Sequence, residues 1–169
     1  ETSTPSQYAW PIQIRSMLGA EYETRNFGVS GAGMMENMND AWINKTAYSE
    51  NKAYDPDIIV IALGTNDSKD NFWNAEKFKE SYIDLINEFQ GYSAYPQIYM
   101  AIPIKAYSTS WQINDATIRE KLTPIMQEIA KEKALPLIDL YDATKDIANL
   151  MASDGIHPKD AGHTIMARR

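Results

Sequence analysis

Apolar side chains recur at helical spacing in three segments of the chain, and each spacing predicts an amphipathic helix. The first begins near Ser6 and stops at Gly19, with an apolar face of Trp10, Ile14, Met17 and Leu18 and with Pro11 in its first turn. The second, ahead of Gly91, has a face of Phe78, Tyr82, Leu85, Ile86 and Phe89. The third has a face of Ile118, Leu122, Ile125, Met126 and Ile129. Asp115 is the expected N-cap of this third helix, and Pro124 is expected to bend it.

Four shorter runs of β-type composition lie between these helices, at residues 22–27, 58–63, 98–102 and 137–140. Strands that alternate with helices of this length predict βαβ units and a parallel sheet. The unbroken apolar run at residues 58–63 predicts a central strand covered on both faces. We therefore expect a three-layered α/β fold, with the chemistry gathered just after the carboxyl ends of the strands.

Composition and charge narrow the possible functions. The chain has 169 residues, of which 44% are hydrophobic and 23% charged, which fits one domain. Its net charge of −7 opposes nucleic acid and anionic membrane surfaces as partners. The longest apolar run has six residues, against roughly 20 for a membrane-spanning helix, so no transmembrane segment is expected. With no cysteine and two histidines, a disulfide framework is excluded and a metal centre is not expected.

A glycine-rich segment, Asn26-Phe27-Gly28-Val29-Ser30-Gly31-Ala32-Gly33, follows the run at residues 22–27. Its glycines permit a sharp turn that presents backbone N–H groups to a ligand, and a plain strand-to-helix turn is the alternative interpretation. It matches neither the Gly-x-Ser-x-Gly nucleophile elbow nor the dinucleotide-binding Gly-x-Gly-x-x-Gly pattern.

Gly64-Thr65-Asn66-Asp67-Ser68 follows the run at residues 58–63. At a strand tip, the Asn66 carboxamide is able to donate an N–H to a developing oxyanion. The alternative is that Asn66 or Asp67 caps the next turn.

Near the C-terminus stands Ser153-Asp154-Gly155-Ile156-His157-Pro158. An aspartate three residues before a histidine is able to fix the tautomer of the imidazole and support general-base catalysis. An ordinary loop ahead of a helix that starts at Pro158 is the alternative.

Taken together, the three segments resemble the second, third and fifth sequence blocks of the SGNH hydrolases, the GDSL-like esterase/lipase family. The resemblance extends from Tyr8-Ala9-Trp10-Pro11 to the terminal helix. It implies a flavodoxin-like three-layer α/β/α sandwich and no cofactor or metal. By this resemblance, the Gly31 backbone N–H and the Asn66 side-chain amide hold an oxyanion, His157 is the general base, and Asp154 orients it.

One family block is absent, because the sequence contains no Gly-Asp-Ser at the end of a first strand. We therefore expect residues 1–169 to form a single domain truncated at the N-terminus, with the nucleophilic serine upstream of Glu1, and trimmed at the C-terminal helix as well. Two consequences follow. No serine should lie within about 2.6 to 3.2 Å of His157 Nε2. The strand at residues 22–27 should be about 9 to 10 Å, two strand spacings, from that at 58–63.

The function expected from this resemblance is that of a serine-dependent carboxylic-ester hydrolase that removes short acyl groups, O-acetyl above all, from carbohydrate. Its partner is then a small-molecule or glycan ester. The alternatives are a lysophospholipase or thioesterase-type acyl hydrolase, an inactive glycan-binding module on the same fold, and a flavodoxin-like nucleotide or flavin binder. Five aromatic residues near these segments either stack on sugar rings or pack the loops: Trp42, Phe72, Trp73, Tyr107 and Trp111.

Overall fold

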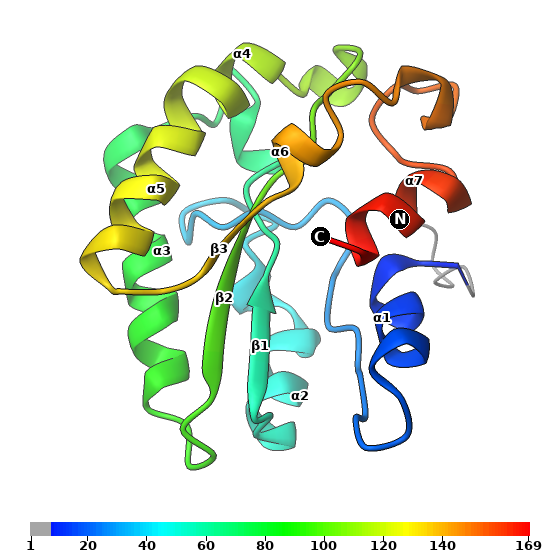
Figure 1. Cartoon of the computed structure of the whole chain (residues 1–169). Helices are drawn as coiled ribbons and strands as arrows, with labels where there is room; N and C mark the ends of the chain where they lie inside the picture. The colour runs from blue at the N-terminus through cyan, green and yellow to red at the C-terminus, as the bar shows by residue number, and fades with distance from the viewer. Residues whose placement is uncertain (1–7) are drawn as a thin grey trace.

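A computed structural model describes residues 8–169 and contains one parallel sheet (Figure 1). Its strands are β1 (Ile58–Ile61), β2 (Gln97–Ile102) and β3 (Leu137–Asp139), in the order β1-β2-β3. Ile59 is in register with Ile98, and Met100 with Leu137. Three of the four predicted strands are therefore confirmed, although β1 ends two residues early and β3 one residue early.

Helices lie on both sides of this sheet. They are α1 (Trp10–Leu18), α2 (Thr46–Tyr54), α3 (Ala75–Gln90), α4 (Asp115–Thr117), α5 (Thr123–Glu132), α6 (Leu140–Ala143) and α7 (Asp160–Ala167). In Figure 1, α3 and α5 lie on one side, and α1 and α7 lie together on the other. Within residues 8–169, none of the helices is long and apolar enough to cross a bilayer.

The core packs the sheet with α3, α5 and the segment at residues 32–42. The predicted apolar face of α3 is fully confirmed, because Phe78, Tyr82, Leu85, Ile86 and Phe89 are all buried. Asn74 caps α3, where its side chain accepts a hydrogen bond of 2.9 Å from Lys77 N, and the helix stops at Gly91. Apolar spacing and end signals agree here, which explains why this helix is predictable from sequence.

The third predicted helix differs in two details. Its N-cap is Asn114, whose side chain accepts from Thr117 N at 3.1 Å. The predicted N-cap, Asp115, instead accepts from Ala106 N at 2.9 Å and from the Tyr141 hydroxyl at 2.8 Å. Before Pro124, the chain forms a π-helical turn over Ile118–Leu122, so the proline falls in the first turn of α5, where it breaks no hydrogen bond.

Two predictions about strands are wrong for the described chain. Residues 22–27 form no strand, because no neighbouring strand pairs with them. The run at residues 58–63 is not a central strand covered on both faces. Instead, β1 is an edge of the described sheet, with Ile58 45% and Val60 37% exposed. Residues 22–27 do not pair with β1, and the expected separation of two strand spacings presupposed a strand that these residues do not form.

A groove of about 740 Å³, called here the open groove, lies between β1, residues 22–28 and α1. Its lining includes Ile14 and Leu18 from α1, and residues 58–63 from β1 and beyond. No residue of α1 is buried. The free edge of a strand offers unpaired backbone N–H and C=O groups, so the groove has both the apolar walls and the hydrogen-bonding edge that an added strand requires.

Candidate active site

Asp154 and His157 form a hydrogen-bonded pair in the loop before α7. Asp154 Oδ2 lies 3.1 Å from His157 Nδ1. The other carboxylate oxygen, Oδ1, accepts from the backbone N–H groups of Ile156 at 2.7 Å and His157 at 2.8 Å. Partial burial pushes the Asp154 pKa upward, but the hydrogen bonds from His157 and Ile156 outweigh it and hold the pKa below its usual range. An ionised Asp154 favours the tautomer that carries the proton on Nδ1 and leaves Nε2 able to accept one.

The histidine faces solvent rather than a serine. Its side chain is 42% exposed, and within residues 8–169 no serine hydroxyl is hydrogen-bonded to it. The hydroxyls of Ser108 and Ser110 both donate instead to the carbonyl oxygen of Asp154, the latter at 2.9 Å. The described residues thus contain no serine hydroxyl bonded to His157, while Ser3 and Ser6 lie outside the described residues.

Gly31 and Asn66 are brought together at the carboxyl end of β1. Gly31 is exposed and has a φ of +76°, and an added Cβ would meet nothing within 4 Å. Its N–H makes no hydrogen bond among the described residues. Asn66 Nδ2 donates to Ala32 O at 3.1 Å, and the side chain caps no helix. A carboxamide carries two N–H donors, and Ala32 O engages one of them.

Asp67 binds the backbone at the end of this glycine-rich loop through its carboxylate, a role that the sequence alone did not reveal. Its side chain is fully buried, and its carboxylate accepts from Met34 N at 2.9 Å and Met35 N at 2.8 Å. Burial raises the pKa of Asp67, although the two N–H groups lower it. The only sequence signal was its position beside Asn66, which is equally typical of a turn cap.

Hydrogen bonds connect the loops that carry these residues. Tyr107 N, after β2, donates to Gly155 O at 2.8 Å. Asn114 N donates to Ser68 Oγ, in the turn after Asn66, at 3.1 Å. The segments that follow β1 and β2 and the loop before α7 therefore meet at one end of the sheet, the upper end in Figure 1. This is the carboxyl edge at which parallel sheets place their sites.

The five aromatic residues near these loops differ in their exposure and in their contacts. Trp42 is buried and donates to Phe27 O at 2.8 Å, and Trp73 packs against Phe78 with ring centroids 5.5 Å apart. The Tyr107 hydroxyl donates to Thr144 O at 2.5 Å. Phe72 is 40% and Trp111 58% exposed. Of the five, only Trp111 has a ring contact with His157.

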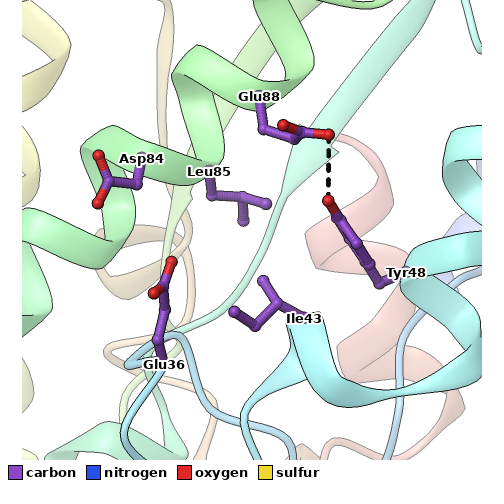
Figure 2. A pocket seen from close by; sticks show the side chains of 6 residues that line it. All are labelled: Glu36, Ile43, Tyr48, Asp84, Leu85 and Glu88. Atoms are coloured by element: carbon purple, nitrogen blue, oxygen red, sulfur yellow. Dashed lines mark hydrogen bonds between the residues drawn. The ribbon is translucent and has the colours of Figure 1, made fainter.

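A second, smaller cavity of about 220 Å³ lies away from this edge, between α2, α3 and the loop before them (Figure 2). Three carboxylates line it, those of Glu36, Asp84 and Glu88. Glu88 accepts from the Tyr48 hydroxyl at 3.1 Å and pairs with Lys52 at 2.6 Å. Across the described residues, no group of three or more such side chains is arranged to hold a metal ion.

Known proteins resemble this chain in sequence and in fold. The GDSL-like lipase/acylhydrolase family matches residues 2–165. An acetylxylan esterase of Xylanibacter ruminicola is 33% identical over 96% of this chain, which spans 38% of that protein. A carbohydrate acetylesterase from Sinorhizobium meliloti has a TM-score of 0.75 at 16% identity, covering 97% of this chain and 83% of its own. The aryl esterase of M. smegmatis has a TM-score of 0.72 at 19% identity, covering 96% and 82%.

The two solved structures share the fold, which confirms the predicted three-layer α/β sandwich. The family match covers nearly the whole chain and includes all three motifs that carried the resemblance. The chain belongs to the GDSL-like lipase/acylhydrolase family.

Proposed function

We propose that this chain supplies the general base and the oxyanion donors of a serine-dependent carboxylic-ester hydrolase that removes O-acetyl groups from carbohydrate. The observation that carries the proposal is the Asp154–His157 pair, on the same sheet edge as Gly31 and Asn66, with no hydrogen bond to His157 Nε2 from residues 8–169. The acetylxylan esterase name of the Xylanibacter ruminicola relative supports the acetyl group and the carbohydrate.

In this mechanism, a serine hydroxyl attacks the ester carbonyl while His157 Nε2 takes its proton. Asp154 holds Nδ1–H and stabilises the imidazolium that results. The tetrahedral oxyanion accepts hydrogen bonds from Gly31 N–H and from the free N–H of Asn66. As the intermediate collapses, the C–O bond to the alcohol breaks and His157 returns the proton to the leaving oxygen. Water, deprotonated by His157 in turn, then releases acetate and restores the serine.

The serine, in this proposal, comes from a strand that precedes residue 1 and lies in the open groove. The apolar walls of the groove and the free edge of β1 support this location. In Figure 1, α1 lies to the side of β1 and begins at the level of its carboxyl end, so a strand parallel to β1 would end at the level where α1 begins. A residue at the tip of such a strand would stand at the edge that holds His157 and Asn66.

The test uses residues 1–169 preceded by their serine-bearing segment, called here the extended polypeptide. Hydrolysis of p-nitrophenyl esters of two to twelve carbons and of acetylated xylooligosaccharides is measured for wild type and for His157→Ala. We expect His157→Ala to lose nearly all turnover and to melt at the wild-type temperature. The matched control is His163→Ala, which replaces the chain's other histidine and should remain active.

Three results would contradict the proposal. Wild-type turnover by His157→Ala would remove the general base from its role. A rate that climbs with acyl length would indicate a lipase or thioesterase. An extended polypeptide that binds the glycan but hydrolyses no ester would indicate the inactive binding module.

A further inference from the structure

Trp111 stands beside the catalytic-histidine candidate without belonging to the core. Its ring centroid lies 5.3 Å from that of His157, with the two planes at 72°. The indole is nevertheless 58% exposed. A large aromatic side chain normally contributes to stability through burial, so an indole left this exposed gains little from its own packing.

The backbone at Trp111 is strained. Trp111 has a φ of +52° and Gln112 a φ of +65°, both in the left-handed region. For residues other than glycine, such a conformation costs about 1 to 3 kcal/mol and persists only where the surroundings hold it. Strain of this kind at an exposed aromatic residue beside a site points to a function.

The surroundings that hold Trp111 are tied to the loop of His157. Ser110 Oγ donates to Asp154 O at 2.9 Å, and Tyr107 N donates to Gly155 O at 2.8 Å. Gly155 has a φ of +68°, and a Cβ there would come within 2.9 Å of Ser108 Cβ. The two loops therefore approach more closely than a side chain at position 155 would allow, and the indole lies against the imidazole.

We propose that Trp111 determines specificity by stacking on the sugar ring that carries the ester, on the alcohol side of the bond that breaks. This inference rests on the proposed function. There, His157 protonates the leaving alcohol, so the alcohol must lie against His157. Because Trp111 touches His157, it contacts the alcohol portion of the substrate and not the acyl group.

The neighbourhood of Trp111 selects a sugar over an alkyl alcohol. The residues around it in the loop are polar: Ser108, Thr109, Ser110 and Gln112. A single indole face among hydroxyls and an amide matches a pyranose ring, which has one face of C–H bonds and a rim of hydroxyls. A long alkyl chain requires a continuous apolar wall, and the apolar open groove lies between other elements.

The first test is binding, which needs no nucleophile. Acetylated xylotetraose is titrated into residues 1–169 by calorimetry, for wild type, Trp111→Ala, Trp111→Phe and Tyr95→Ala. Tyr95 is a matched control, because it is 85% exposed with a φ of +51° but lies in the turn before β2, at the opposite end of the sheet. We expect Trp111→Ala to raise the dissociation constant on the order of tenfold, Trp111→Phe about threefold or less, and Tyr95→Ala not at all.

The second test separates binding from chemistry in the extended polypeptide. Trp111→Ala should raise the KM for the acetylated glycan by a similar factor and leave both constants for ethyl acetate, which has no ring, within about twofold. An equal loss on both substrates would overturn the inference, since Trp111 would then act by positioning His157. Unchanged glycan binding would also overturn it. If no ester is hydrolysed but binding still depends on Trp111, the proposed function fails and the sugar contact stands.

Discussion

Replacement of Asp67 by alanine tests how the oxyanion loop is held. The Asp67 carboxylate is the acceptor for Met34 N and Met35 N, and both methionines are buried. An unpaired buried N–H costs about 1 to 3 kcal/mol, so two of them cost about 2 to 6 kcal/mol. Relief from burying the carboxylate offsets part of this cost. We expect Asp67→Ala to lower the free energy of unfolding by about 2 to 4 kcal/mol.

Asp67→Asn is the matched variant, because both N–H groups reach Oδ1 and a carboxamide oxygen is able to accept both. Its Nδ2 replaces Oδ2, which also accepts from Met34 N, so a smaller loss than for alanine is expected. Urea unfolding followed by circular dichroism gives the three free energies. An Asp67→Ala chain within about 1 kcal/mol of wild type would refute the reasoning, because it would mean that the loop finds other acceptors.

The stability difference between wild type and Asp67→Asn should depend on pH with a definite sign. Burial raises the pKa of Asp67, so the folded chain binds this proton more tightly than the unfolded chain does. The resulting stability is complete below the ordinary aspartate pKa of about 3.9 and is lost as the pH rises through the higher folded value. The advantage of wild type over Asp67→Asn should therefore shrink with rising pH across that window. An advantage that grows would refute the assigned shift.

The remaining predictions concern the candidate site. Asn66→Ala in the extended polypeptide should lower kcat on the order of 10² to 10³-fold with little change in KM, measured on p-nitrophenyl acetate. Gly155→Ala should lower the urea midpoint more than Gly19→Ala, because both have positive φ but only the former brings a Cβ to 2.9 Å from another side chain. Asp154 has a lowered pKa, so its contribution to stability, relative to Asp154→Asn, should be complete above pH about 3.9 and lost as the pH falls through the lower folded value.

Local sequence patterns predicted the parts of the molecule that local interactions determine. The apolar face of α3 follows from spacing within one helix. The pairing of Asp154 with His157 follows from three residues of separation and from N–H groups in the same turn. Both are determined by neighbours in sequence, and both appear in the structure as expected.

Long-range contacts account for what the sequence left open. Asp67 binds N–H groups more than 30 residues away, and Trp111 meets a histidine in another loop. The wrong N-cap has the same origin. Asn114 and Asp115 are both good caps, but the Asp115 carboxylate accepts hydrogen bonds from Ala106 N and the Tyr141 hydroxyl, which leaves Asn114 as the cap. Residues 22–27 have strand-like composition, but a strand also needs a neighbour with which to pair.

Val60 offers a test of the open groove that does not depend on the chemistry. It is 37% exposed on the free edge of β1, so Val60→Lys in residues 1–169 should change stability by no more than about 0.5 kcal/mol. If a strand fills the groove in the extended polypeptide, the same lysine is buried there without a partner, at a cost of several kcal/mol. Ile12→Lys is the control, because Ile12 is 38% exposed on α1 and does not line the groove. Urea unfolding of wild type and both variants, in both lengths of polypeptide, decides between these outcomes. An equal, small effect of Val60→Lys in both lengths would mean that nothing occupies the groove.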